Sequence, residues 1–334
     1  LKGQTALLWQ KELFTSHLKL INNTQPDAFI NLQAKINKQF IGNVKAVAQE
    51  PKGGQLGELL FLPPEQAVDI ELSLSAKPSN DRLNWNLEHF KLPWQAHKLN
   101  AHAEGHVDHQ LKTLTLSDLN LFIDQKQQKF SGWFKENEFE LEAALKSLPI
   151  DLTSRFQDYF KGGELSGQIY ANGPYSSPSI RSNISASTQY NGEPLLIDTQ
   201  ASGNLDTVNL ERAFINLGDA KLETTGDVLI TQQALDLKIK SLSGPVDIIE
   251  TFNILLPDDL LIEINKANGY LQGPFTSPTY SGYVDANGKY KHQRFKLTSD
   301  FQGDINKIDL DKLKAQLATG IVNANGLINW HNQK

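Results

Sequence analysis

Two stretches of this 334-residue chain, residues 162–187 and 262–287, are versions of one another. The run NGPYSSP, from Asn172 to Pro178, returns as QGPFTSP from Gln272 to Pro278, which is 100 positions later. The same offset relates Gly203, Leu210 and Gly226 to Gly303, Leu310 and Gly326, so it holds without a gap over about 65 residues. Repetition at a fixed period is typical of arrays built from one supersecondary unit. The chain is therefore expected to form an array rather than a globule with one pocket.

The repeat predicts the domain organisation. Repeat units are expected at approximately residues 145–240 and 245–334, within one continuous, elongated structure that covers residues 1–334. A weaker third copy starts at Gly105 and lies within residues 1–144. The chain starts at Leu1 and contains no Met, which predicts a segment of a longer protein.

Apolar residues recur at every second position in many short segments. Because side chains on a strand point to opposite faces in turn, each such segment builds one apolar and one polar face. Roughly 20 to 25 strands of this kind are expected, in an antiparallel sheet covered on one side at most. The predicted fold class is all-β, with an elongated, curved antiparallel sheet that forms an open, taco-like trough or β-groove. The residues expected to line the groove are Ile70, Leu72, Leu74, Leu114, Leu116, Leu205, Leu235, Leu237 and Ile239.

Glycine and proline predict where strands end. Gly173-Pro174 and Gly273-Pro274 are expected to end strands, because Pro cannot donate to a ladder; Pro178 and Pro278 are then expected to precede the next strand. Tight turns are expected at Asn80-Asp81, Asn191-Gly192, Gly218-Asp219, Asn287-Gly288 and Asn325-Gly326. Mixed spacings of three and four residues predict short amphipathic helices at residues 150–160 and 246–256, and irregular strands are the alternative there.

Composition excludes several classes of function. Cys is absent, which removes disulfides and thiolate metal sites. The net charge of −6 predicts no basic face and no cluster of Lys or Arg interleaved with aromatic residues, so nucleic acid is not an expected partner. No apolar run approaches the roughly 20 residues needed to cross a bilayer.

The segment from His102 to His109 is the one candidate for metal chemistry. On a strand, His102, Glu104, His106 and Asp108 share a face, where imidazoles can share a metal, but the polar side of an amphipathic strand has the same composition. We favour the latter interpretation. Phosphate-binding loops, dinucleotide fingerprints, HExxH and GxSxG are missing from the sequence. No enzymatic activity, cofactor or metal is therefore expected.

The glycine and proline pattern resembles a known family. The run from Gly163 to Ile169, followed by Gly173-Pro174 and Ser177-Pro178, resembles the repeated strand units of TamB-type proteins, the AsmA-like inner-membrane subunits of the bacterial translocation and assembly module. The pattern returns from Gly269 to Pro274, with Ser277-Pro278 and Gly282 after it, and the resemblance covers about residues 145–334.

The resemblance implies a location and partners. Such proteins are anchored in the inner membrane by an N-terminal helix, cross the periplasm of Gram-negative bacteria as a β-groove, and meet an Omp85-class, TamA-like barrel in the outer membrane. They are linked to phospholipid movement between the membranes and to outer-membrane assembly. The anchor and the barrel-binding region lie outside this chain, so contact with the inner membrane and the barrel is expected only through other parts of a parent protein.

The expected function is therefore to conduct phospholipids in the periplasm, with acyl chains in an apolar groove. The alternative is a scaffold or chaperone that assembles outer-membrane proteins, including autotransporters, by β-augmentation at open sheet edges. A further alternative for the apolar face is the closed core of an ordinary sandwich.

Overall fold

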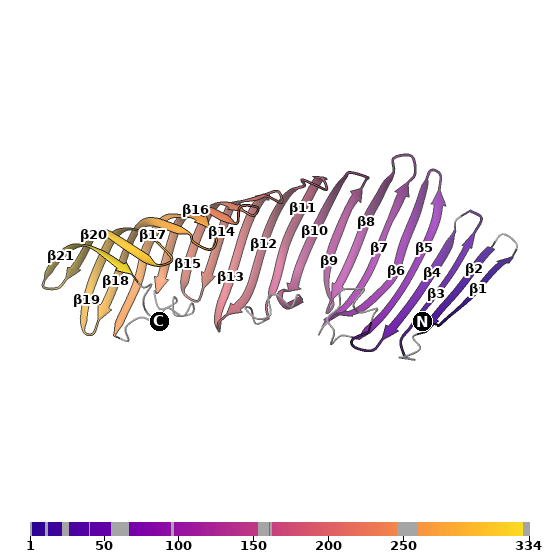
Figure 1. Ribbon diagram of the computed structural model, residues 1–334, viewed down its shortest axis with the longest axis horizontal. Coiled ribbons are helices and arrows are strands. Elements are labelled where there is room, and N and C mark those ends of the chain that lie inside the picture. Colours follow the sequence, from indigo (N-terminus) through magenta and orange to yellow (C-terminus); the bar gives the residue numbers. More distant parts are fainter. Residues whose placement is uncertain are drawn as a thin grey trace. The chain divides into compact units, whose positions relative to one another are not determined.

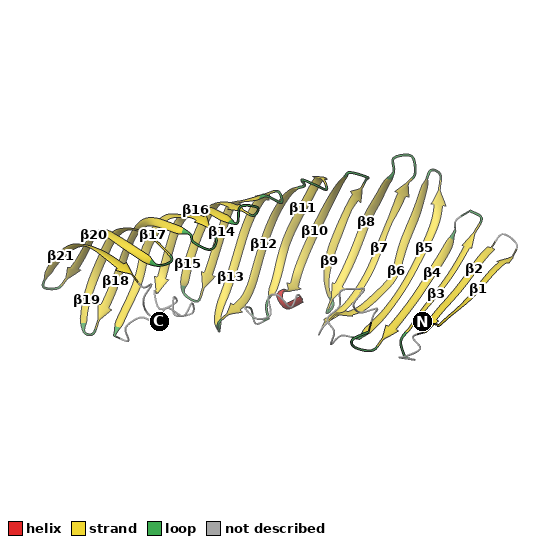
Figure 2. Cartoon of the chain, in the orientation of Figure 1, coloured by secondary structure: helices red, strands yellow, loops and turns green. Residues whose placement is uncertain are grey.

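The computed structural model describes residues 2–10, 13–21, 27–39, 41–54, 67–94, 97–152, 160, 162–245 and 259–329. These residues form 21 strands that belong to one open antiparallel sheet (Figure 1). Strands account for nearly all described residues, as Figure 2 shows in yellow. The predicted all-β fold class and the expected number of strands are confirmed.

The first of two compact units comprises residues 1–148 and 168–176. Its strands β1 to β10 pair consecutively, each with its neighbour along the chain, so the unit is a simple meander. Its strands are β1 (Lys2–Gln10), β2 (Leu13–Ile21), β3 (Phe29–Asn37), β4 (Gly42–Glu50), β5 (Val68–Ser79), β6 (Arg82–Trp94), β7 (His97–Asp108), β8 (Thr113–Ile123), β9 (Lys126–Phe134) and β10 (Glu138–Pro149).

The second unit comprises residues 149–167 and 177–334, and β11 (Glu164–Pro174) straddles the boundary. The strands after β11 again pair consecutively. They are β12 (Ser179–Tyr190), β13 (Glu193–Gly203), β14 (Thr207–Leu217), β15 (Ala220–Leu229), β16 (Ala234–Pro245), β17 (Leu260–Pro274), β18 (Thr279–Tyr290), β19 (Gln293–Asp304), β20 (Lys307–Leu317) and β21 (Gly320–Asn329).

The Gly-Pro pairs act as the sequence predicts. β11 ends at Pro174 and β17 ends at Pro274, and β12 and β18 begin directly after Pro178 and Pro278. Gly173 and Gly273 have φ values of 108° and 99°, in a region that residues with a Cβ rarely adopt. Both copies of the repeat therefore turn in the same way.

Two of the predicted tight turns are wrong. Asn287-Gly288 lies inside β18 and Asn325-Gly326 lies inside β21. At the first of these, the ring of Phe295 on β19 occupies the space where a side chain of residue 288 would lie. Gly288 therefore makes room for a cross-strand aromatic ring instead of reversing the chain.

Helical structure is almost absent from the described ranges. Ile150–Leu152 forms a single 3-10 turn, η1, and Phe160 forms an isolated bridge with Tyr190. The other residues of the predicted helix at 150–160, and all of the one at 246–256, lie outside the described residues. Within the described part of the chain no helix is long and apolar enough to span a membrane.

Apolar residues meet across the strands because β-bulges keep their alternation in phase. On β8, β14 and β20 the apolar spacing widens from two to three residues, at Leu116 to Leu119, Leu210 to Ala213 and Leu310 to Leu313. Each widening coincides with a register shift, which places the extra residue in a bulge. The bulge returns the next apolar side chain to the same face and adds local bend and twist.

Candidate functional site

The apolar face of the first unit runs across successive strands. Leu74 on β5 lies opposite Val44 on β4 and Leu87 on β6, and this row continues through Ala103 to Leu119. The predicted groove residues Ile70, Leu72 and Leu74 all belong to this face and are half-buried. Leu116 also lies there, opposite Gly105 and Gly132, and is half-buried.

The second unit repeats the arrangement. Leu237 on β16 lies opposite Gly226 on β15 and Leu271 on β17, and Leu271 in turn lies opposite Tyr280. Leu235 and Ile239 lie on the same face of β16, and all three predicted residues on this strand are half-buried. The row that contains Leu237 therefore crosses β15 to β18.

Leu205 does not belong to this face. β13 ends at Gly203, and the side-chain oxygen of Asn204 accepts hydrogen bonds from the backbone of Asp206 and Thr207. This Asx-turn interrupts the strand, so Leu205 lies in the turn and is 53% exposed. Leu114 is on β8 as predicted, but it is 41% exposed.

Large apolar side chains are rarely buried in the described part of the chain. Eleven apolar residues are buried there, and eight of these are alanines. The accessible surface is 21452 Å², whereas two separate compact domains that share this mass would expose roughly 16,500 Å² in total. The apolar face is thus not the filled core of a sandwich, and its Leu, Ile and Phe side chains remain accessible.

The opposite face is polar, and its side chains link neighbouring strands. The amide of Gln272 donates to Asp236 at 2.8 Å, and the amide of Asn209 donates to Asp227 at 2.7 Å. Asp285 accepts from Asn265 at 2.8 Å and pairs with Lys296 at 3.2 Å, and these contacts, the Asn265 hydrogen bond first, lower the pKa of its carboxyl group. The polar face is therefore tied together from strand to strand.

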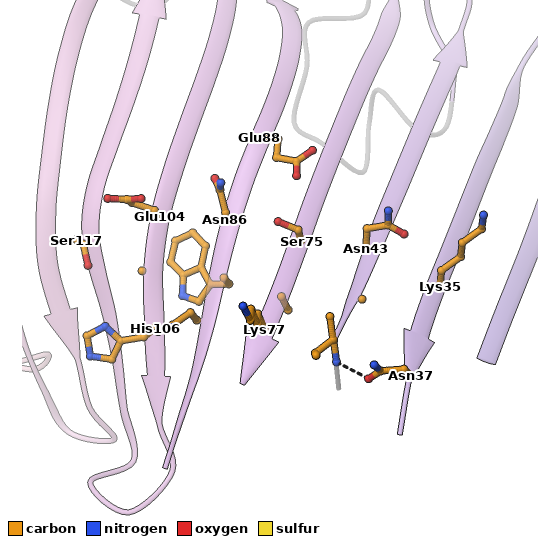
Figure 3. Close-up of a pocket in the computed structure, with 16 residues that line it drawn as sticks. Lys35, Asn37, Asn43, Ser75, Lys77, Asn86, Glu88, Glu104, His106 and Ser117 are labelled. Carbon is orange, nitrogen blue, oxygen red and sulfur yellow. Dashed lines mark hydrogen bonds between the residues drawn. The ribbon is translucent and has the colours of Figure 1, made fainter. Parts of the chain in front are cut away.

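One concavity on the polar face of the first unit departs from this rule (Figure 3). Its volume is about 820 Å³, and a row of polar residues crosses it from β3 to β7, comprising Lys35, Asn43, Ser75, Asn86 and Glu104. None of these five side chains forms a hydrogen bond or ion pair with another described residue. Lys35 and Lys77 balance Glu88 and Glu104 in charge, so the concavity offers hydrogen bonds without a net charge.

The described segment from His102 to His109 does not bring three possible metal ligands together. No group of three or more His, Asp or Glu residues in the described ranges is placed to hold a metal ion. The Nδ1 atom of His102 lies 2.6 Å from the carbonyl oxygen of Glu88. Asp108 is buried and accepts backbone hydrogen bonds from Leu111 and Gln110, which, with Arg82, lower the pKa of its carboxyl group. Asp108 thus closes the turn that follows β7.

The two edges of the second unit differ in their hairpin turns. Successive turns on one edge expose a large apolar side chain: Leu205, Ile230, Phe275 and Ile305 are each about half exposed. On the other edge, the turns after β12, β14, β18 and β20 consist of Asn191-Gly192, Gly218-Asp219, Lys291-His292 and Ala318-Thr319. The described turns are therefore apolar on one edge and largely polar on the other, where the connection after β16 lies outside the described residues.

The expectation that Lys and Arg do not cluster with aromatic residues is wrong at the β18–β19 hairpin. Residues 289–296 read KYKHQRFK, and net charge alone conceals them. Lys289 and Arg294 lie opposite one another across the hairpin and line a cavity of about 520 Å³. Apolar residues of β17 and β19, namely Leu260, Leu261, Ile262 and Phe295, also line it.

Comparison with protein-family models, with curated proteins and with solved structures gives no match.

Proposed function

We propose that this chain is a non-enzymatic carrier segment that binds acyl chains of phospholipids along its apolar face and conducts them between membranes of the cell envelope. The accessible apolar rows on one face of an otherwise polar sheet carry this proposal. The resemblance to TamB-type proteins adds the periplasm as the location, and the inner membrane and an Omp85-class barrel as partners of a parent protein.

The energetics favour acyl chains as the ligand. Burial of each methylene contributes about 0.8 kcal/mol, so an apolar surface several strands wide offsets much of the cost of removing a chain from a bilayer. Leu, Ile, Val and Phe recur from strand to strand, and adjacent strands lie about 4.8 Å apart. The binding energy therefore varies little along the rows, which allows an acyl chain to slide.

Site-specific photo-crosslinking tests the proposal. A benzophenone amino acid at Leu237 should crosslink to co-purifying phospholipid, as detected by mass spectrometry. The same residue at Lys238 is the matched control, because it is adjacent on the same strand and lies on the polar face. Equal lipid yields from both positions would contradict the proposal.

A substitution links binding to transfer. Leu237→Asp places a charge in the middle of the apolar row and should abolish lipid transfer between vesicles, while Lys238→Asp should preserve it. Circular dichroism should show an unchanged β-sheet in both variants. Crosslinks from Leu237 to polypeptide in place of lipid would favour the scaffold function instead.

A further inference from the structure

We infer that the β18–β19 hairpin is a phosphate-binding site that receives the headgroup of an anionic phospholipid, with an acyl chain in the adjoining apolar cavity. This inference rests on the proposed function and adds the class of headgroup and the place where it binds. Three cations carry it: Lys289, Lys291 and Arg294.

The cations are exposed and available. Lys289 and Arg294 form no ion pair or hydrogen bond through their side chains with any other described residue. The ammonium of Lys291 lies 5.4 Å from the centre of the Tyr290 ring, a contact that an arriving phosphate can share. By contrast, Lys296 is already paired with Asp285 at 3.2 Å. Two acidic residues are close by: Glu263 lines the cavity, and the carbonyl oxygen of Asp259 accepts a hydrogen bond from the backbone of Lys291 at 3.1 Å. The three cations outnumber these two acidic residues.

Apolar residues beside the cations distinguish this site from a simple anion site. Leu261 lies directly opposite Lys289 and is 59% exposed, although it has a charged neighbour. Ile262 and Phe295 also line the cavity, and they flank Gly288 on the opposite face of the sheet. A ligand that satisfies both parts has a phosphate and a hydrocarbon chain, which is the chemistry of a phospholipid.

The strand register fixes the orientation of the ligand. Lys289, Arg294 and Leu261 lie opposite one another on the polar face, whereas Gly288, Ile262 and Phe295 lie on the apolar face. A phosphate held by Lys289 and Arg294 therefore lies on the polar face near the end of the hairpin, and Leu261 is the apolar residue that a chain beside it contacts first.

The other copy of the repeat provides an internal comparison. Its β12–β13 hairpin has Gln189, Asn191 and Pro194 at the positions of the three cations, and Glu193 adds a negative charge. The backbone is alike, since Asn191 and Lys291 have φ values of 50° and 55°. The charge of β18–β19 is thus a property of its side chains and not a requirement of the turn.

Calorimetric titration of the whole chain with monomeric short-chain phosphatidylglycerol tests the site. The probes for comparison are phosphatidylcholine of the same chain length, inorganic phosphate and a single-stranded oligonucleotide. Phosphatidylglycerol should bind about tenfold more tightly than phosphatidylcholine. The triple variant K289Q/K291Q/R294Q should weaken phosphatidylglycerol binding about ten- to a hundredfold, because each cation near an anionic lipid contributes substantially.

Two control variants separate the site from general charge. K221Q/K238Q/K314Q removes the same charge from exposed strand positions of the second unit and should change binding less than twofold. Leu261→Gln should weaken phosphatidylglycerol binding about threefold or more and leave phosphate binding unchanged. Equal losses in both triple variants, tighter binding of the oligonucleotide, or phosphate binding as tight as lipid would overturn the inference.

The outcomes also distinguish this inference from the proposed function. If phosphatidylcholine and phosphatidylglycerol bind equally while Leu237 still crosslinks to lipid, the headgroup site is wrong and the apolar carrier face is retained. If Leu237 captures no lipid, the carrier function fails, whatever the hairpin binds.

Discussion

The strands β12, β14 and β15 have the same bounds as β18, β20 and β21 once 100 is subtracted from the latter. The two copies also share a bulge, after Leu210 and after Leu310, and an Asx-turn, at Asn204 and at Asp304. They differ in what surrounds equivalent residues. Gly226 faces β16, whereas Gly326 faces no further described strand. The two copies therefore share their backbone geometry. The effect of a substitution on the free energy of unfolding depends on the neighbouring strands, which differ between the copies.

Substitution of these two glycines is expected to give the largest difference between the copies in the free energy of unfolding. A Cβ at Gly226 would lie 2.2 Å from the carbonyl oxygen of Asp236, and its φ of 129° is rare for other residues. Gly226→Ala should therefore lower the free energy of unfolding by about 2 to 3 kcal/mol. Gly326→Ala meets nothing within 4 Å and should change it by less than about 0.5 kcal/mol. Urea denaturation measures both, and similar losses would show that the copies are not distinguished by their neighbours.

The sequence predicted much of this backbone from local chemistry. Alternating apolar residues identified the strands, and Gly173-Pro174 with Gly273-Pro274 marked where two of them end. The bulges were missed, although their signal is visible: Leu210 and Ala213 are three residues apart in a pattern of two. A break of one residue in an otherwise regular alternation thus predicts a bulge when the same face is apolar on both sides of it.

Three other predictions were wrong because strand pairing, a side-chain hydrogen bond and local charge clustering outweigh residue preference and net charge. Asn-Gly favours tight turns, yet at Asn287-Gly288 pairing with both neighbouring strands decides the conformation. Leu205 fits the apolar alternation in the sequence, but the Asx-turn formed by the Asn204 side chain ends the strand before Leu205. The cations of the β18–β19 hairpin were hidden by the net charge of −6, which reports nothing about local clusters. Most of the apolar face could be predicted from the sequence. The hairpin site could not, because only the strand register shows that Lys289 and Arg294 lie opposite one another.

A smaller difference in stability between the copies is expected on the apolar face, beside the bulge of β20. The hydroxyl of Ser299 is buried and lies 3.0 Å from the carbonyl oxygen of Asp311, a bulge residue. Ser299→Ala leaves this carbonyl without its side-chain donor and should cost about 1 to 2 kcal/mol. At the equivalent position, Thr199 lies 3.3 Å from the carbonyl oxygen of Ile184 and is half-buried, so Thr199→Val should cost about 0.5 kcal/mol or less. A larger loss at Thr199 would reverse the order that the geometry predicts.

The smallest expected difference is in the pH dependence of stability. It arises at a polar position where the two copies have different residues. Asp285 corresponds to Ser185, and hydrogen bonds from Asn265 and Lys296 hold the pKa of Asp285 below its ordinary value of 3.8. A carboxyl group whose pKa is lowered by folding stabilises the folded state above the ordinary pKa, and this stability is lost as pH falls through the folded value. Asp285→Asn should therefore be slightly less stable than the parent at pH 7, and this gap should narrow as pH falls below 3.8. Urea denaturation at several pH values measures the gap, and a gap that stays constant down to pH 3 would show that the Asp285 carboxylate contributes nothing through its charge.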